Sequence, residues 1–508
     1  TSFNFGVNYN LFKMEIIILF INREEYMITK FVTKLILAGI ISLSFVASQA
    51  QATKIGVFLQ NIYAPESNPA SKEAFEQLLS SYKQANPDVE VDLIPYMGGS
   101  QSDYYAWLTT RIAAGDEPDV GWSHWYDRNA RSERWLPLNE YLEGPNEYIP
   151  AGQPGHDRWM DIFDEGVMAQ IRHGNGNWYQ LNTNWVETGL YLNEDILTSR
   201  GLPVEWDNWS EFIDTCKALR ADGIQPLGVF SSVGWSTYQW LDTVLISAAF
   251  QDSLEKWQLP EYSNPFMTAR QLTLEEISKA VHDGEYNVNN PRFDTFLDLT
   301  EEVVTHCIVE GFTGIPDLDT ILNLFLSGET AMSWLGTWNA VAVQDGAKFN
   351  FRSTFYPPFT SDNSPYVSDP IMYRVGGPSS SGQVGLSVST VDRGTVDAAI
   401  DFVKFYTAPA NYQAVANSDQ GMLTVINGVE SPDVAKGFIA ISKLPERGIT
   451  DAVSRFGGEE FGTPHNRMMQ SFMMGDISRD ELKEDYQKLL DKTLKKLCEE
   501  NAWDWCSS

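Results

Sequence analysis

The sequence predicts an α/β protein with largely parallel sheets flanked by helices. Short apolar or alternating runs, typical of strands, alternate along the chain with stretches whose apolar residues recur at helical spacing. This order of elements is typical of helices packed on the faces of mostly parallel sheets. About 455 residues follow a predicted secretion signal. That length exceeds one ordinary domain, so two lobes are expected.

The first elements follow from their apolar spacing. Val89, Val91 and Leu93 alternate with acidic residues, as in a strand with one buried face. Gly115 marks the end of a helix. In order, the expected elements are a strand at 55–59, a helix around 75–82, strands at 89–93 and 119–122, and a helix at 102–114 between those two strands.

The later elements are expected on the same grounds. Apolar residues from Trp209 to Leu219 recur at helical spacing, and Gly223 follows as a stop signal. A strand is expected at 226–230, and a helix from 396 to 406 with Thr395 as a candidate N-cap. The tail from 466 to 497 reads as helical.

A secretion signal is expected at residues 27–52. Lys30 and Lys34 form a short basic head, an apolar run follows from Leu35 to Val46, and Ala50-Gln51-Ala52 resembles a cleavage site. The apolar run is short for a membrane span. The mature chain is therefore expected to begin near Thr53, in the periplasm. Residues 1–26 are interpreted as translated upstream sequence, and an N-terminal extension or a second anchor is the alternative.

The charge of the chain excludes some partners. The formal net charge is −32, and residues 1–52 carry four basic and three acidic side chains, so the remainder is about −33. Such a surface repels nucleic acid and anionic membranes. Neither is expected as a partner, and a soluble monomer is expected.

Four cysteines are too few for a disulfide-based fold. Cys216 lies on the apolar stripe of a predicted helix, and Cys307 lies in an apolar stretch, so both are interpreted as core residues. Cys498 and Cys506 flank a short loop near the C-terminus, where a disulfide is plausible in an oxidising compartment.

The sequence carries few signs of catalysis. It contains no Walker loop, no Gly-x-Ser-x-Gly elbow and no His-Glu-x-x-His. The six histidines are scattered without the spacing of a metal site. We therefore expect no enzyme, no cofactor and no metal.

Aromatic and amide residues cluster directly after the predicted strands. Ligands of open α/β sheets lie at the carboxyl ends of strands. The candidate residues there are Gln60, Asn61, Tyr96, Gln101, Trp122, Trp125, Tyr126, Asp127, Asn184, Trp185, Glu187, Trp235, Tyr238, Trp334 and Trp338.

Flat aromatic faces beside amides and carboxylates suit a sugar, whose C–H face stacks and whose hydroxyls form hydrogen bonds. The same rings could hold a quaternary ammonium group by cation–π contacts. For any single tryptophan, a place in the core explains its burial equally well. Core residues, however, need not gather at strand ends.

Several segments resemble, in order, the extracellular solute-binding proteins of carbohydrate ABC importers, the maltose-binding-protein-like family. Gly115-Asp-Glu-Pro-Asp-Val120 is similar to the family's "agd-pDv" segment, and Trp135-Leu-Pro-Leu-Asn-Glu-Tyr-Leu142 to its "l-pLdeyl" segment. Further similar segments lie at 189–212, 325–332 and 398–409, so the resemblance covers nearly all of residues 53–495. The usual proline before the hinge segment is missing near Leu181.

The resemblance implies a type II periplasmic-binding-protein fold, with two lobes, a hinge of crossing strands and the sugar bound in the cleft. The first lobe would comprise 53–184 plus 352–432, and the second 185–351 plus 433–508. It also implies a two-subunit permease and a cytoplasmic ATPase as partners.

The resemblance also assigns site residues. The family's aromatic after "pDv" falls at Trp122 or Trp125, its hinge segment at 184–187, and its later aromatic at Trp334 or Trp338. Its glycine-rich crossover resembles Gly376-Gly377-Pro378 through Gln383, which adds Gly377 and Gln383 to the candidates.

The expected function is capture of a sugar or oligosaccharide for an importer. The alternatives are a periplasmic ligand-binding sensor and a binding protein for a quaternary ammonium solute. A glycan-degrading enzyme would need two carboxylates facing each other across the cleft.

Overall fold

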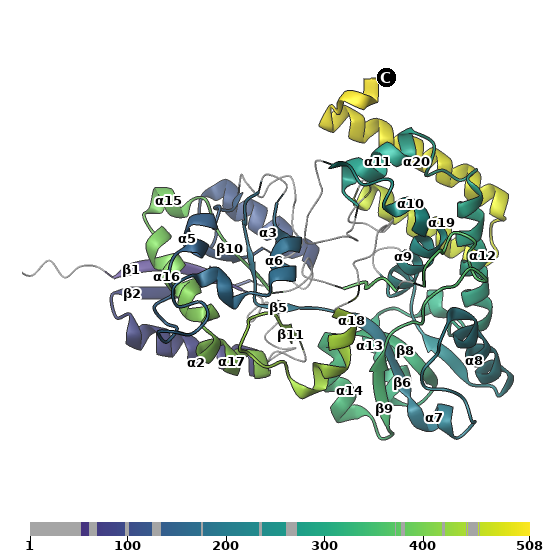
Figure 1. Cartoon of the computed structure of the whole chain (residues 1–508), viewed down its shortest axis with the longest axis horizontal. Coiled ribbons are helices and arrows are strands. Elements are labelled where there is room, and N and C mark those ends of the chain that lie inside the picture. The colour runs from purple at the N-terminus through teal and green to yellow at the C-terminus, as the bar shows by residue number, and fades with distance from the viewer. Residues whose placement is uncertain are drawn as a thin grey trace, which may run out of the picture. The chain divides into compact units, whose positions relative to one another are not determined.

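The computed structural model describes residues 52–59, 69–96, 101–123, 134–173, 176–232, 236–260, 272–370, 372–376, 382–418, 422–442, 444, 456 and 458–507 (Figure 1). Residues 1–51, which include all of the expected secretion signal except its last residue, lie outside these residues. No helix in the described part is long and apolar enough to cross a membrane.

The chain divides into two compact units. Of the smaller unit the structure describes residues 52–54 and 86–90, where the Thr53 amide donates to the Asp88 carbonyl (2.9 Å) and Lys54 pairs with Glu90 (3.8 Å). The larger unit spans 55–85 and 91–508, and it contains the second sheet described below and all of the first sheet except residues 53–54 and 89–90.

The first sheet has five strands in the order β2-β1-β3-β10-β4. β1 and β3 are parallel, whereas β10 runs antiparallel to both β3 and β4. The strands are β1 (Thr53–Phe58), β2 (Val89–Leu93), β3 (Val120–Trp122), β4 (Leu181–Asn182) and β10 (Gln383–Leu386). The helices of this part are α2 (Pro69–Ala85), α3 (Gln101–Ala114), α5 (Asn139–Glu143), α6 (Glu165–Ile171), α15 (Thr390–Arg393), α16 (Val396–Thr407) and α17 (Pro409–Ser418), with a 3₁₀ turn η2 (Trp159–Ile162).

Trp135 packs on the first sheet where two glycines face each other. Gly121 of β3 and Gly385 of β10 are register partners. A Cβ atom at either glycine would lie within 2.7 Å of the Trp135 ring. Both positions therefore need glycine so that the indole can approach the backbone, which explains how the segment beginning at Trp135 is held.

Asp119 joins β3 to its neighbours. Its carboxylate accepts from the Gly56 amide (2.7 Å) and the Thr395 hydroxyl (2.5 Å), and it pairs with Arg393 (3.3 Å). Thr395 lies at the N-cap position of α16, as predicted, but its side chain makes no cap hydrogen bond to the helix. The hydroxyl instead donates to the Asp119 carboxylate, and a charged acceptor makes such a hydrogen bond strong.

The second sheet has four strands in the order β7-β8-β6-β9. β7 and β8 are parallel, and β6 runs antiparallel to β8 and β9. The sheets are thus more mixed than expected, because the strands that leave one sheet for the other run against their neighbours. The strands are β6 (Thr188–Asn193), β7 (Gln225–Gly228), β8 (Thr330–Gly336) and β9 (Phe351–Thr354).

Helices flank this second sheet and carry most of its core. α13 packs against β7 and β8, and α8 against β7, while α9 packs against α12. The helices are α7 (Glu194–Thr198), α8 (Trp209–Ala221), α9 (Tyr238–Ala249), α10 (Gln251–Leu254), α11 (Leu274–His282), α12 (Pro291–His306), α13 (Leu318–Leu326) and α14 (Ala340–Gly346), with 3₁₀ turns η4 (Phe312–Gly314) and η5 (Thr337–Asn339).

The C-terminal part is helical, as predicted. α19 and α20, at the yellow end of the chain in Figure 1, pack on each other, and α20 also packs on α11. The elements are η7 (Asp433–Phe438), α18 (Ile439–Ser442), α19 (Glu459–Met473), α20 (Arg479–Asn501) and η8 (Asp504–Ser507). A capping box of Ser478 and Glu481 begins α20.

Two disulfides are present. Cys498 and Cys506, for which the sequence made a disulfide plausible, are joined. Cys216 and Cys307 are fully buried, as a core position requires, but they are also bonded to each other. The sequence interpretation missed this bond because the two residues are 91 positions apart.

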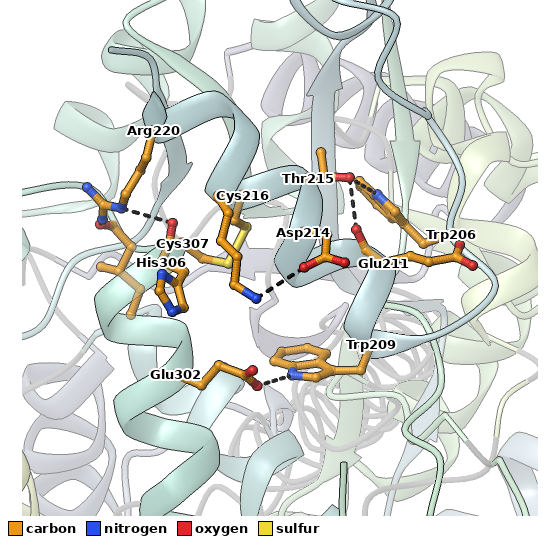
Figure 2. Close-up of a disulfide and its surroundings, with 12 residues drawn as sticks. Trp206, Trp209, Glu211, Asp214, Thr215, Cys216, Arg220, Glu302, His306 and Cys307 are labelled. Atoms are coloured by element: carbon orange, nitrogen blue, oxygen red, sulfur yellow. Dashed lines mark hydrogen bonds and ion pairs between the residues drawn. A yellow bond between two sulfur atoms is a disulfide. The ribbon is translucent and has the colours of Figure 1, made fainter. Parts of the chain in front are cut away.

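The disulfide between Cys216 and Cys307 fixes the C-terminal end of α12 to α8, as Figure 2 shows. Arg220 of α8 reinforces the junction by donating to the carbonyl oxygens of His306 (2.9 Å) and Ile308. At the start of α8, the Trp209 indole donates to Glu302 of α12 (3.3 Å).

Candidate functional site

Aromatic side chains gather where β1, β2 and β3 end. Phe58 and Trp122 end their strands, and Tyr96 follows β2. Tyr104 lies between these rings, with centroids 5.3 Å from Phe58, 5.8 Å from Tyr96 and 5.2 Å from Trp122. Its hydroxyl donates to the Trp122 carbonyl. The predicted residues Tyr96 and Trp122 are therefore brought together.

Only some of these rings reach the surface. Trp122 and Tyr104 are buried, whereas Tyr96 is half-buried. Trp107 of α3 is also half-buried and packs against Tyr96 (5.5 Å). The sequence analysis missed Trp107, although its position three residues after Tyr104 places both on one helix face.

Buried amides continue from Trp122 along the next strands. The Ser123 amide donates to the Gln383 carbonyl (3.0 Å), and Gln383 is the register partner of Asn182. The Asn184 side chain accepts from the Gly382 amide (2.6 Å). β5 (Asn184–Trp185) then pairs with β11 (Leu423–Thr424) in a separate two-stranded ladder.

A buried ion pair follows directly. Glu187 accepts from the Trp185 indole (2.7 Å) and the Gly376 amide (3.2 Å), and it lies 3.7 Å from the Arg374 guanidinium. Arg374 also lies over the Trp185 ring, 4.4 Å from its centroid. The side chains of Glu187 and Arg374 are 0% and 1% exposed. We call Trp185, Glu187, Arg374 and Gly376 the crossing cluster.

Thr337 connects this cluster to the second sheet. Its amide donates to the Glu187 carbonyl (2.8 Å), and its hydroxyl accepts from the Glu187 amide (3.3 Å). Trp338 follows it, is half-buried, and meets Trp240 edge to face at 5.8 Å. The Trp338 ring covers Gly336, where a Cβ would lie 2.3 Å from it.

Tyr238 and Trp334 lie elsewhere. Trp334 is 1% exposed and packs between Phe355 and Tyr356 in the core. Tyr238 is 3% exposed, and burial raises the pKa of its hydroxyl well above the ordinary value. The half-buried residue of α9 is Trp240, two positions further along the helix and so on a different face.

The other predicted site residues cannot be placed. The side chain of Gln101 and all of Gln60, Asn61, Trp125, Tyr126, Asp127, Trp235 and Gly377 lie outside the described residues.

A separate pocket of about 500 Å³ lies along α20. Its lysines pair with acidic side chains, Lys483 with Asp294 (2.8 Å) and Lys488 with Glu484 (2.8 Å). This pocket contains none of the predicted site residues.

One connected series of contacts thus links the described candidates other than Tyr238 and Trp334. It runs from the aromatic residues at the ends of the first strands, through the buried amides and the crossing cluster, to Trp338 and Trp240. Its half-buried rings have faces suited to stacking, whereas its amides and its carboxylate are buried and bind groups of the protein itself. In the described part of the chain, no group of three or more His, Cys, Asp or Glu residues could hold a metal ion.

A family model, bacterial extracellular solute-binding protein, matches residues 77–438, which is most of the chain. The chain belongs to this family. Its fold is the two-lobed α/β fold of these proteins, as the sequence predicted. A search of curated proteins finds no match.

Solved structures share the fold at low identity. The chitin oligosaccharide binding protein has a TM-score of 0.61 and 17% identity, with 88% of this chain and 100% of that chain covered. MsmE of Bacillus subtilis, in an open conformation, has a TM-score of 0.61 and 16% identity, with 90% and 100% covered. RafE in complex with raffinose has a TM-score of 0.57 and 15% identity, with 87% and 100% covered.

Proposed function

We propose that this solute-binding protein captures a sugar or oligosaccharide between its two lobes. The observation that carries the proposal is the connected series of contacts, with half-buried rings at both ends and buried amides and a carboxylate between them. Structural neighbours named for raffinose and chitin oligosaccharide support a sugar as the ligand.

Binding alone would perform this function, with no bond made or broken. A sugar that contacts both lobes stabilises the closed state, because only that state offers both sets of contacts. The closed, monomeric protein would then deliver the sugar to an ABC permease in the membrane. The predicted secretion signal at 27–52 would place the mature chain in the periplasm.

The test is a thermal-shift screen of residues 53–508 against monosaccharides, oligosaccharides, polyols and betaines. A ligand that binds only the native state raises the melting temperature once its concentration exceeds the dissociation constant. We expect one sugar class to raise it without turnover. A shift with betaines alone would favour the quaternary ammonium alternative, and no shift with any compound would contradict the proposal.

Trp338 provides a residue-level test. Replacing Trp338 with Ala should weaken binding of the sugar identified in the screen by about 1–3 kcal/mol, by analogy with base–aromatic stacking. Isothermal titration calorimetry measures the change. Trp503→Ala is the matched control, because that half-buried ring stacks on Trp505 outside the series. Equal affinities of the Trp338→Ala variant and the wild type would remove Trp338 from the site.

A further inference from the structure

The chain passes between the two sheets three times. The first passage, from β4 to β6, covers 182–188. The second connects β9, which ends at 354, with β10, which begins at 383, and the structure describes it at 354–370, 372–376 and 382–383. The third follows β11, and its η7 contacts β9 of the second sheet. These passages are the covalent connections about which two lobes could move.

The crossing cluster joins the first two passages and contacts the segment that follows the third. Glu187 belongs to the first passage, and Arg374 and Gly376 belong to the second. Glu187 binds Gly376 through one carboxylate oxygen and approaches Arg374 with the other. Arg374 also donates to the Leu444 carbonyl (2.9 Å), beyond the third passage. One buried ion pair therefore connects segments that are far apart in the sequence.

The backbones of the first and second passages approach each other closely at Gly376. A Cβ at Gly376 would lie 2.3 Å from the Val186 carbonyl oxygen and 2.6 Å from the Glu187 Cα. Glycine therefore allows the second passage to lie directly against the first. A buried ion pair is weak evidence for stability, since desolvation offsets its attraction, and its best-attested use is to fix one register between segments.

We propose that Glu187 and Arg374 are positioning residues for ligand binding. They hold the first two passages, and the segment that follows the third, together as one block, so that closure bends these segments jointly rather than separately. Without the pair the ligand-free protein samples more arrangements, and the ligand must select among them. The apparent affinity then falls in proportion to the fraction of molecules that are in an arrangement able to bind the ligand. This inference rests on the proposed function.

The test uses a double variant, Glu187→Gln with Arg374→Met, which removes both charges and leaves no unpaired buried charge. Spin labels on Lys83→Cys of α2 and Asn323→Cys of α13, both exposed, report the distance between the two sheets' helices. We expect a broader distance distribution without ligand and a dissociation constant raised about 5-fold to 150-fold.

Asp119→Asn is the matched control. It also removes a buried carboxylate charge, but the partners that bind this carboxylate, Gly56, Thr395 and Arg393, all belong to the first sheet and its helices. We expect it to lower the melting temperature while leaving the distance distribution and the affinity unchanged.

The outcomes separate this inference from the proposed function. An unchanged distribution and affinity in the double variant would overturn the positioning role while leaving sugar binding intact. If the wild type binds no sugar, the proposed function fails, and the ligand-free distance distribution alone still decides whether the pair holds the passages together. If the distance distribution broadens in Asp119→Asn as much as in the double variant, loss of any buried carboxylate charge makes the protein more flexible, and the inference is also overturned.

Discussion

Glu187 illustrates how one side chain can join distant parts of this chain. Its carboxylate is fully buried, yet it accepts from an indole and a backbone amide and lies near a guanidinium. A buried carboxylate needs such partners, because an uncompensated buried charge is very costly. The candidate site is therefore built on contacts that leave little freedom to the residues around it.

Gly376 gives a residue-scale prediction. Gly376→Ala should destabilise the protein by about 1–3 kcal/mol, because the added methyl would meet backbone that cannot move aside. Urea denaturation measures the change. Gly314→Ala is the control, since a Cβ there meets nothing within 4 Å. An equal effect of both substitutions would show that the close approach at Gly376 has no energetic consequence.

At the scale of elements, each sheet is joined to its helices by polar and covalent contacts as well as by the core. Asp119 links β1, β3 and the start of α16 in the first sheet. In the second, Cys216 and Cys307 link α8 to the end of α12. A crosslink stabilises chiefly by restricting the unfolded chain, and more so when it closes a longer loop.

The two disulfides should therefore differ in effect. Replacing Cys216 and Cys307 with Ser should lower the free energy of unfolding by about 4–5 kcal/mol, and replacing Cys498 and Cys506 by about 2–3 kcal/mol, from their loop lengths. Chemical denaturation of the two double variants measures both values. A larger loss from the C-terminal pair would contradict the loop-length argument.

At the scale of the whole molecule, buried tyrosines determine the response to alkali. Burial raises the pKa of Tyr191 and Tyr356 far above the ordinary value, and raises that of Tyr373 to about 12. The pKa of the Tyr82 hydroxyl is also raised, by burial and by its hydrogen bond to Asp401. In the unfolded chain these hydroxyls ionise near pH 10.

Because the pKa values of these tyrosines are raised in the folded protein, their contribution to the free energy of unfolding is fully present below pH 10 and is lost as the pH rises above it. Each such tyrosine should contribute a slope of roughly 1.4 kcal/mol per pH unit. Urea midpoints from pH 8 to 11.5, with phenolate absorbance, measure this slope. Tyr191→Phe should reduce it by one tyrosine's share, and an unchanged slope would mean that Tyr191 ionises without unfolding.

The sequence predicted the fold better than the site. Periodicity located strands and helices, and the resemblance supplied the family, because both depend on local patterns. Periodicity could not pair Cys216 with Cys307 or Glu187 with Arg374, since those contacts depend on how distant segments pack. The sequence analysis named Tyr238 and not Trp240, because which side chain of α9 lies near the surface depends on how the helix packs against its neighbours. The proposed lobe boundaries and ligand contacts stay predictions.

The order of the disulfides affects how the chain can mature. Four cysteines allow three pairings, and the observed one joins the first to the second and the third to the fourth. A chain that meets an oxidant from its N-terminal end onward can complete the first bond before the third cysteine emerges. Successive oxidation therefore yields the native bonds directly, without a later exchange between wrongly paired sulfurs.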